Sequence, residues 1–186
     1  VSSSIRAMNS IRNSILLAIT LTITVNVVGL FIVLVTEYFD IKGAKILRVI
    51  FMSTLVFGGI ILNNGYLYVY GQDGIFTSFL TNINPDLNPL WFTGYPAVLF
   101  VMTFACTSNH MLFLRNAVNG MDNNSIEAAQ NLGSGQFQIL RRVVIPSLKP
   151  VLLTLIIMTF QTGLGAMAAP LMIGGRDFQT ISPLIL

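Results

Sequence analysis

The sequence predicts an all-α membrane protein: a bundle of about five transmembrane helices with one long polar connection. Of its 186 residues, 54% are hydrophobic and only 9% are charged, whereas soluble domains carry about 25% charged residues. Four runs without Asp, Glu, Lys or Arg are long enough to cross a bilayer, since about 20 helical residues suffice. These runs are residues 15–35, 49–72, 90–114 and 151–175. None of them alternates apolar and polar residues as a barrel strand would.

With their flanks, the runs predict spans at roughly residues 13–36, 47–71, 90–114 and 148–173, with a shorter apolar run at 180–186. Because this last run is truncated and the first residue is not Met, we expect residues 1–186 to be one transmembrane domain from a longer subunit. Gly58 and Gly59 favour a local kink in the second span. Small residues near the end of the fourth span would let another helix approach closely. They are Gly163, Gly165, Ala166, Ala168 and Ala169.

The distribution of basic residues predicts the orientation. If residues 115–147 are cytoplasmic and the spans alternate, seven of the ten basic residues fall on the cytoplasmic side. This agrees with the positive-inside rule. The cytoplasmic set is Lys42, Lys45, Arg48, Arg115, Arg141, Arg142 and Lys149, and the external set is Arg6, Arg12 and Arg176.

The sequence offers little for catalysis, and we expect no catalytic residue, metal ion or cofactor. It lacks a G-x-x-x-x-G-K-[ST] phosphate loop and a G-x-S-x-G elbow. One His and one Cys cannot form a usual metal site; we expect His110 to pack or face water, and Cys106 to be a small buried apolar residue. The net charge of +3 is scattered, which argues against nucleic-acid binding.

The polar connection, residues 115–147, has the pattern of a helix, a glycine turn and a second helix. Asn124 and Glu127 have the spacing of an N-cap and its partner acid. Gly133 is a natural helix stop, because it tolerates a left-handed backbone. Ser134 can cap a second short helix over residues 135–144, and Pro146 would begin the next span. Local physics alone leaves open that this is merely a capped loop.

The spacing of this connection resembles the cytoplasmic signature of the permease subunits of binding-protein-dependent ABC importers. That signature is Glu-Ala-Ala, three residues, Gly, nine residues, and then aliphatic, any residue, aliphatic, Pro. The matching residues are Glu127, Ala128, Ala129, Gly133, Val143, Ile145 and Pro146. The family usually has Ile and Leu where this chain has Val143 and Ile145, so the aliphatic character is kept.

The resemblance implies a multi-pass subunit of the bacterial cytoplasmic (inner) membrane that pairs with a second permease and receives solute from an external binding protein. Residues 115–147 would be a cytoplasmic helix-turn-helix coupling loop, docked on a separate ATPase with Glu127 at the boundary between ATPase lobes. The chain itself would then not be an enzyme, because ATP hydrolysis would take place in the partner.

The solute is predicted from the residues after the fourth span. Residues 168–180 resemble the branch that transports ferric iron, polyamines and phosphonates, and we expect ferric iron, with the other two as alternatives. Two other classes also stay open: an ion-coupled secondary carrier and a structural membrane protein. A carrier would need coupling-ion ligands or a broken helix near the midplane. The candidates for these are Gly58-Gly59 and Asn63-Asn64.

Overall fold

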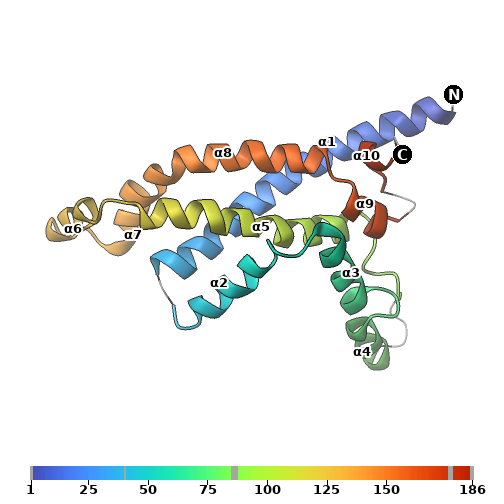
Figure 1. Cartoon of the computed structure of the whole chain (residues 1–186), viewed down its shortest axis with the longest axis horizontal. Helices are drawn as coiled ribbons and strands as arrows, with labels where there is room; N and C mark the ends of the chain where they lie inside the picture. The colour runs from blue at the N-terminus through green and yellow to red at the C-terminus, as the bar shows by residue number, and fades with distance from the viewer. Residues whose placement is uncertain (1, 40, 85–87, 176–177, 185–186) are drawn as a thin grey trace.

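The structure is a computed structural model that describes all residues except 1, 40, 85–87, 176–177 and 185–186. Arg176 of the external basic set and the end of the run at 180–186 therefore lie outside the described residues. Every regular element in the described part is helical, which confirms the all-α membrane class. Figure 1 shows an elongated molecule with both termini near one end and α6 and α7 at the other.

The helices follow one another in chain order with short connections. They are α1 (Ser2–Val33), η1 (Leu34–Tyr38), α2 (Ala44–Ser53), α3 (Gly59–Tyr70), α4 (Ile75–Ile83), α5 (Tyr95–Asn119), α6 (Asn123–Asn131), α7 (Gln136–Ile139), η2 (Leu140–Val144), α8 (Ile145–Leu164), α9 (Ala168–Ile173) and α10 (Ile181–Leu184). The two η segments are single π-helical turns: η1 ends the helix that begins with α1, and η2 lies between α7 and α8.

Three helices among the described residues are long and apolar enough to cross a membrane. They are Ala7–Tyr38, Tyr95–Asn119 and Gln136–Leu164. They correspond to the first, third and fourth predicted spans. The predicted span at 180–186 is represented by the four residues of α10.

The second predicted span is divided into α2 and α3. The hydroxyls of Ser53 and Thr54 donate to carbonyl oxygens three residues back, at 2.7 and 2.6 Å. Such bonds compete with the helical ladder where α2 ends. Gly58 then adopts an extended conformation, and α3 begins at Gly59. The expected kink is therefore a complete break in the helix.

The fourth span begins earlier than its sequence predicts. Residues 136–164 form one continuous helical segment, so Pro146 lies within it and does not start it. The segment widens into a π turn at Leu140–Val144, where the Ile145 N–H donates to the Leu140 carbonyl. Since Pro146 has no N–H, one bond is missing from the ladder directly after this wide turn. The second helix is also capped by Gly135 and not by Ser134.

The core is the contact of α1 with α5 and α8, which run alongside it (Figure 1). One buried cluster includes Leu21, Val98 and Ile173, and a second, nearer to α6, includes Met111 and Leu148. The predicted close approach of small residues is confirmed at Gly163. A Cβ added there would lie 2.6 Å from the Ala18 Cα.

Candidate functional site

The first turn of α6 is capped by Asp122, whose carboxylate accepts a hydrogen bond from the Asn124 N–H at 3.0 Å. The prediction of Asn124 as N-cap is therefore wrong. Both residue types are good caps, and the earlier one begins the helix. Consequently Glu127 lies too far into α6 to serve as the acid of a capping box. Its side chain is exposed and forms no ion pair with any described residue.

The end of α6 is a Schellman motif built on Gly133. The Ser134 N–H donates to the Ala129 carbonyl at 3.0 Å, and the Gly133 N–H donates to the Gln130 carbonyl at 2.8 Å. Gly133 has φ +79°, a left-handed conformation that favours glycine. The predicted left-handed stop is thus confirmed, and the turn has one defined geometry.

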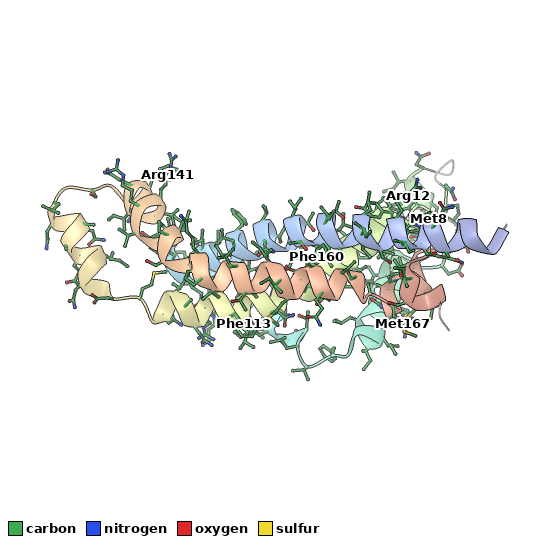
Figure 2. The ribbon with its side chains drawn as sticks, turned by 90° about the horizontal axis from the view of Figure 1, so that it is seen from above. Met8, Arg12, Phe113, Arg141, Phe160 and Met167 are labelled. Carbon is green, nitrogen blue, oxygen red and sulfur yellow. The ribbon has the colours of Figure 1, made fainter. Side chains whose placement is uncertain are left out.

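The loop rests on the end of the bundle through one face of α6. Ile126 and Ala129 pack against the buried cluster that contains Met111 and Leu148. Glu127 and Ala128 are exposed on the opposite face. Figure 2 shows Arg141 at this end of the molecule, far from Met8 and Arg12 at the other end.

The residues of the sequence signature divide into two groups. Val143 and Ile145 are half-buried and, like Ala129, pack against the second core cluster. Glu127, Ala128, Gly133 and Pro146 are exposed. The first group therefore holds the loop on the spanning helices, and the second is free to meet another molecule.

Two apolar residues beside the turn escaped the sequence analysis. Leu132 and Phe137 are 87% and 75% exposed, although both are large and apolar. They flank the segment from Gly133 to Gly135 on a loop with few other apolar side chains at its tip. Large exposed apolar side chains beside a polar turn are candidates for contact with another protein. Their position on either side of a glycine turn is the sequence signal that could have identified them.

A second feature that the sequence did not reveal is an ion-pair cluster near α6. The Glu37 carboxylate, whose side chain is 4% exposed, lies 2.6 Å from Arg48 Nε and 3.3 Å from Arg115 Nε. The three residues come from η1, α2 and α5. Glu37 also lines a cleft of about 480 Å³ with Met121 and Gln130 of the loop region. The cluster joins three helices at the end that carries the loop.

The lone histidine and cysteine both lie in the interior. His110 is fully buried, and its Nε2 is 3.1 Å from Asn26 Oδ1. It also packs so closely on Gly29 that a Cβ there would meet the ring at 2.5 Å. Cys106 is buried and has no disulfide partner. Within the described part of the chain, no cluster of His, Cys, Asp and Glu could hold a metal ion.

A multi-pass helical membrane protein with a hydrogen-bonded polar loop at one end has the form of a transport permease. Residues 3–185 match the family described as "binding-protein-dependent transport system inner membrane component", and the chain belongs to this family. The family comprises transport components and is not a class of enzymes.

The individual relatives that the chain resembles are also named as permeases. The chain is 40% identical over 181 residues to a probable ABC transporter permease of Sinorhizobium fredii, covering 97% of this chain and 32% of that protein. It is 28% identical over 158 residues to a probable ABC transporter permease of Pyrococcus horikoshii, covering 80% and 53%. It is 26% identical over 133 residues to the probable transport system permease NifC of Clostridium pasteurianum, covering 72% and 45%. The chain thus spans between about a third and a half of the length of these relatives.

Proposed function

We propose that this chain is part of the transmembrane subunit of an ATP-driven importer, and that α6 and the Gly133 turn dock on a separate cytoplasmic ATPase. The observation that carries this proposal is that Glu127, Leu132 and Phe137 are all exposed on the loop that contains the Gly133 turn. Glu127 does not cap α6, and Leu132 and Phe137 are not covered by other residues of the chain. All three lie near a turn whose backbone is defined by hydrogen bonds. Such a surface is suited to a protein cleft that offers both apolar contact and hydrogen-bond donors.

The connection between the loop and the spans explains how docking would be transmitted. The residues after the turn continue without interruption into a helical segment that ends at Leu164. Ile126 and Ala129 hold α6 against the same bundle. A displacement of the turn would therefore move a whole spanning helix. ATP would act by favouring one of two arrangements of the ATPases, and the loop would pass that preference to the membrane domain.

The remaining parts of the importer follow from the same proposal. A second permease would complete the pathway, and an external binding protein would deliver the solute. The subunit would lie in the bacterial cytoplasmic membrane with residues 115–147 on the cytoplasmic side. For the solute we keep ferric iron, with a phosphonate or a polyamine as alternatives, on the resemblance of residues 168–180.

Two glycines of the loop provide a matched test. Gly133 and Gly135 are both exposed, and an added Cβ would meet no atom within 4 Å at either position. They differ in backbone, because Gly133 has φ +79° and Gly135 is the N-cap of α7 at φ −69°. Serine is strained in the first conformation and favourable in the second.

The full-length subunit should be purified in mild detergent as Gly133→Ser and as Gly135→Ser, with its bound proteins identified by mass spectrometry. We expect an ATPase with a phosphate-binding loop to accompany the native protein and Gly135→Ser, and to be reduced with Gly133→Ser. Equal ATPase recovery in both variants would argue against the turn as the docking element. Recovery of the native subunit alone, from membranes shown to contain candidate ATPases, would favour a carrier or a structural role.

A further inference from the structure

A cavity of about 510 Å³ lies at the break in the second predicted span. It is formed by the beginning of α3, the middle of α5 and the segment from the end of α8 into α9. Its lining includes Gly59, Asn63, Cys106, Gln161, Thr162 and Gly165. It is separate from the loop and from the cleft beside Glu37.

Asn63 is the most unusual residue of this lining. It is 4% exposed, and its side chain makes no hydrogen bond with any residue that the structure describes. The amide atoms of Asn63 are nevertheless not enclosed by protein, because among the described residues the fully enclosed unpaired side-chain atoms belong to His110 and Arg115. Because Asn63 lines the cavity, its amide is available to a hydrogen-bonding ligand there.

The beginning of α3 faces the same cavity. Gly59 is its first residue and lies one helical turn before Asn63, and no side chain caps this helix end. A Cβ at Gly58 or Gly59 would have no atom within 4 Å, so the backbone here is uncovered. The first N–H groups of a helix lack intrahelical partners and carry a partial positive charge.

The charge balance of the lining follows from these groups. Among the lining residues that the structure describes, the polar side chains are neutral amides and hydroxyls, with no Asp, Glu, Lys or Arg. The cavity therefore combines donor groups and a positive helix end with no negative side chain. Such a combination favours a negatively charged, hydrogen-bond-accepting ligand.

From this geometry we propose that the cavity binds the passing solute as a small hydrogen-bond-accepting anion. Its transport role rests on the function proposed above. A phosphonate is an anion that accepts hydrogen bonds, whereas a polyamine is a cation and does not fit. A bare ferric ion would lack the carboxylate or phenolate oxygen ligands that hard cations prefer. If iron is the solute, it crosses as a complex with negatively charged oxygen atoms on its outside.

Cys106 allows the charge preference to be measured directly, because this thiol lies in the cavity wall. The full-length subunit, in membranes with its partner proteins, should be treated with an anionic sulfonatoethyl or a cationic trimethylammonioethyl methanethiosulfonate. The rate at Cys106 is followed by mass spectrometry of its peptide and divided by the rate of each reagent with free cysteine. We expect the corrected rate to be about five-fold higher for the anionic reagent, as expected of a nearby helix end.

Asn63 and Asn64 provide the matched variants. Asn64 is the next residue of α3, but it is exposed and lines a different pocket. Asn63→Asp places a negative charge in the cavity and should abolish or reverse the preference for the anionic reagent, while Asn64→Asp should retain it. Equal rates or a cationic preference in the native protein would overturn the proposal. So would an unchanged preference in Asn63→Asp, or no reaction with either reagent.

This result is independent of the proposed ATPase docking, because the labelling needs no nucleotide. A subunit that captures an ATPase but shows no anionic preference would overturn the cavity proposal alone. A subunit that shows the preference but captures no ATPase would leave the anion site standing and overturn the importer mechanism.

Discussion

Two asparagines, the half-buried Asn26 and the buried Asn63, show how differently the two sides of the bundle are built. Asn26 of α1 donates to Thr159 Oγ1 at 3.2 Å, and its Oδ1 lies 3.1 Å from His110 Nε2, so it joins three helices. Asn63 of α3 has no hydrogen-bonding partner among the described residues. The same side chain therefore joins helices on one side and faces a cavity on the other.

The backbone explains the difference. On the side of α1, glycines bring helices into contact, with Gly163 against Ala18 and Gly29 against His110. On the side of α3, Gly58, Gly59 and Gly65 have open space where a Cβ would lie. Close glycine contacts bring polar groups within bonding distance of one another, and the broken helix leaves Asn63 without such neighbours.

The largest expected effect is at the contact between α8 and α1. Gly163→Leu would force a side chain into the Ala18 backbone, and overpacking costs about 3 kcal/mol. We expect a clearly lower Tm of the purified full-length subunit in detergent, measured by intrinsic fluorescence. Gly65→Leu is the matched control, since it adds the same atoms in open space. A similar loss of stability in both variants would contradict the contrast between the two sides.

The next largest loss of stability is expected where Asn26 joins α1, α5 and α8 through hydrogen bonds. Asn26→Leu removes both interhelical bonds, together with the bond to the Thr22 carbonyl within α1, and leaves His110 Nε2 without its acceptor, at a cost of about 2 kcal/mol. We expect a lower Tm than the native subunit in the same fluorescence assay. The matched control is Asn63→Leu, which replaces an asparagine without a hydrogen-bonding partner among the described residues. An unchanged Tm in Asn26→Leu would show that this contact does not hold the helices together.

A smaller loss is expected at the ion-pair cluster. Glu37→Gln leaves Arg48 and Arg115 facing a neutral amide, and because both arginines are partly exposed the cost should be about 1 kcal/mol. Glu127→Gln, at an exposed acid of the loop, should leave the Tm unchanged. Equal Tm values for the two variants would show that the Glu37 cluster does not stabilise the subunit.

The smallest expected effect is that of Asn63→Leu. Because the native amide has no protein partner, its removal should change stability by less than about 0.5 kcal/mol, or increase it. The same fluorescence assay measures it beside Asn26→Leu. A loss as large as that of Asn26→Leu would mean that Asn63 stabilises the fold, and would remove the main support for the anion site.

Some of these features could be predicted from the sequence because they depend on local chemistry. Three long apolar helices follow from hydropathy, and the left-handed Gly133 follows from the missing Cβ. The choice between Asp122 and Asn124 as cap could not be predicted, since both are suitable and lie two residues apart. The complete break before Gly59 depends on the side-chain bonds of Ser53 and Thr54 in addition to glycine.

The features that the sequence did not reveal are non-local. Glu37, Arg48 and Arg115 come from three separate helices, and no spacing along the chain links them. The unpartnered state of Asn63 likewise depends on which side chains fail to reach it. Such features require the packed arrangement of helices, which hydropathy does not specify.

The measurement that tests the importer assignment most directly is site-specific photocrosslinking in intact membranes. A benzophenone amino acid would replace Glu127 on the exposed face of α6, or Met8, which is 67% exposed at the opposite end of the molecule (Figure 2). We predict that position 127 crosslinks to an ATPase with a phosphate-binding loop and that position 8 does not. An ATPase attached at position 8, or none at position 127 in membranes where it is present, would contradict the assignment.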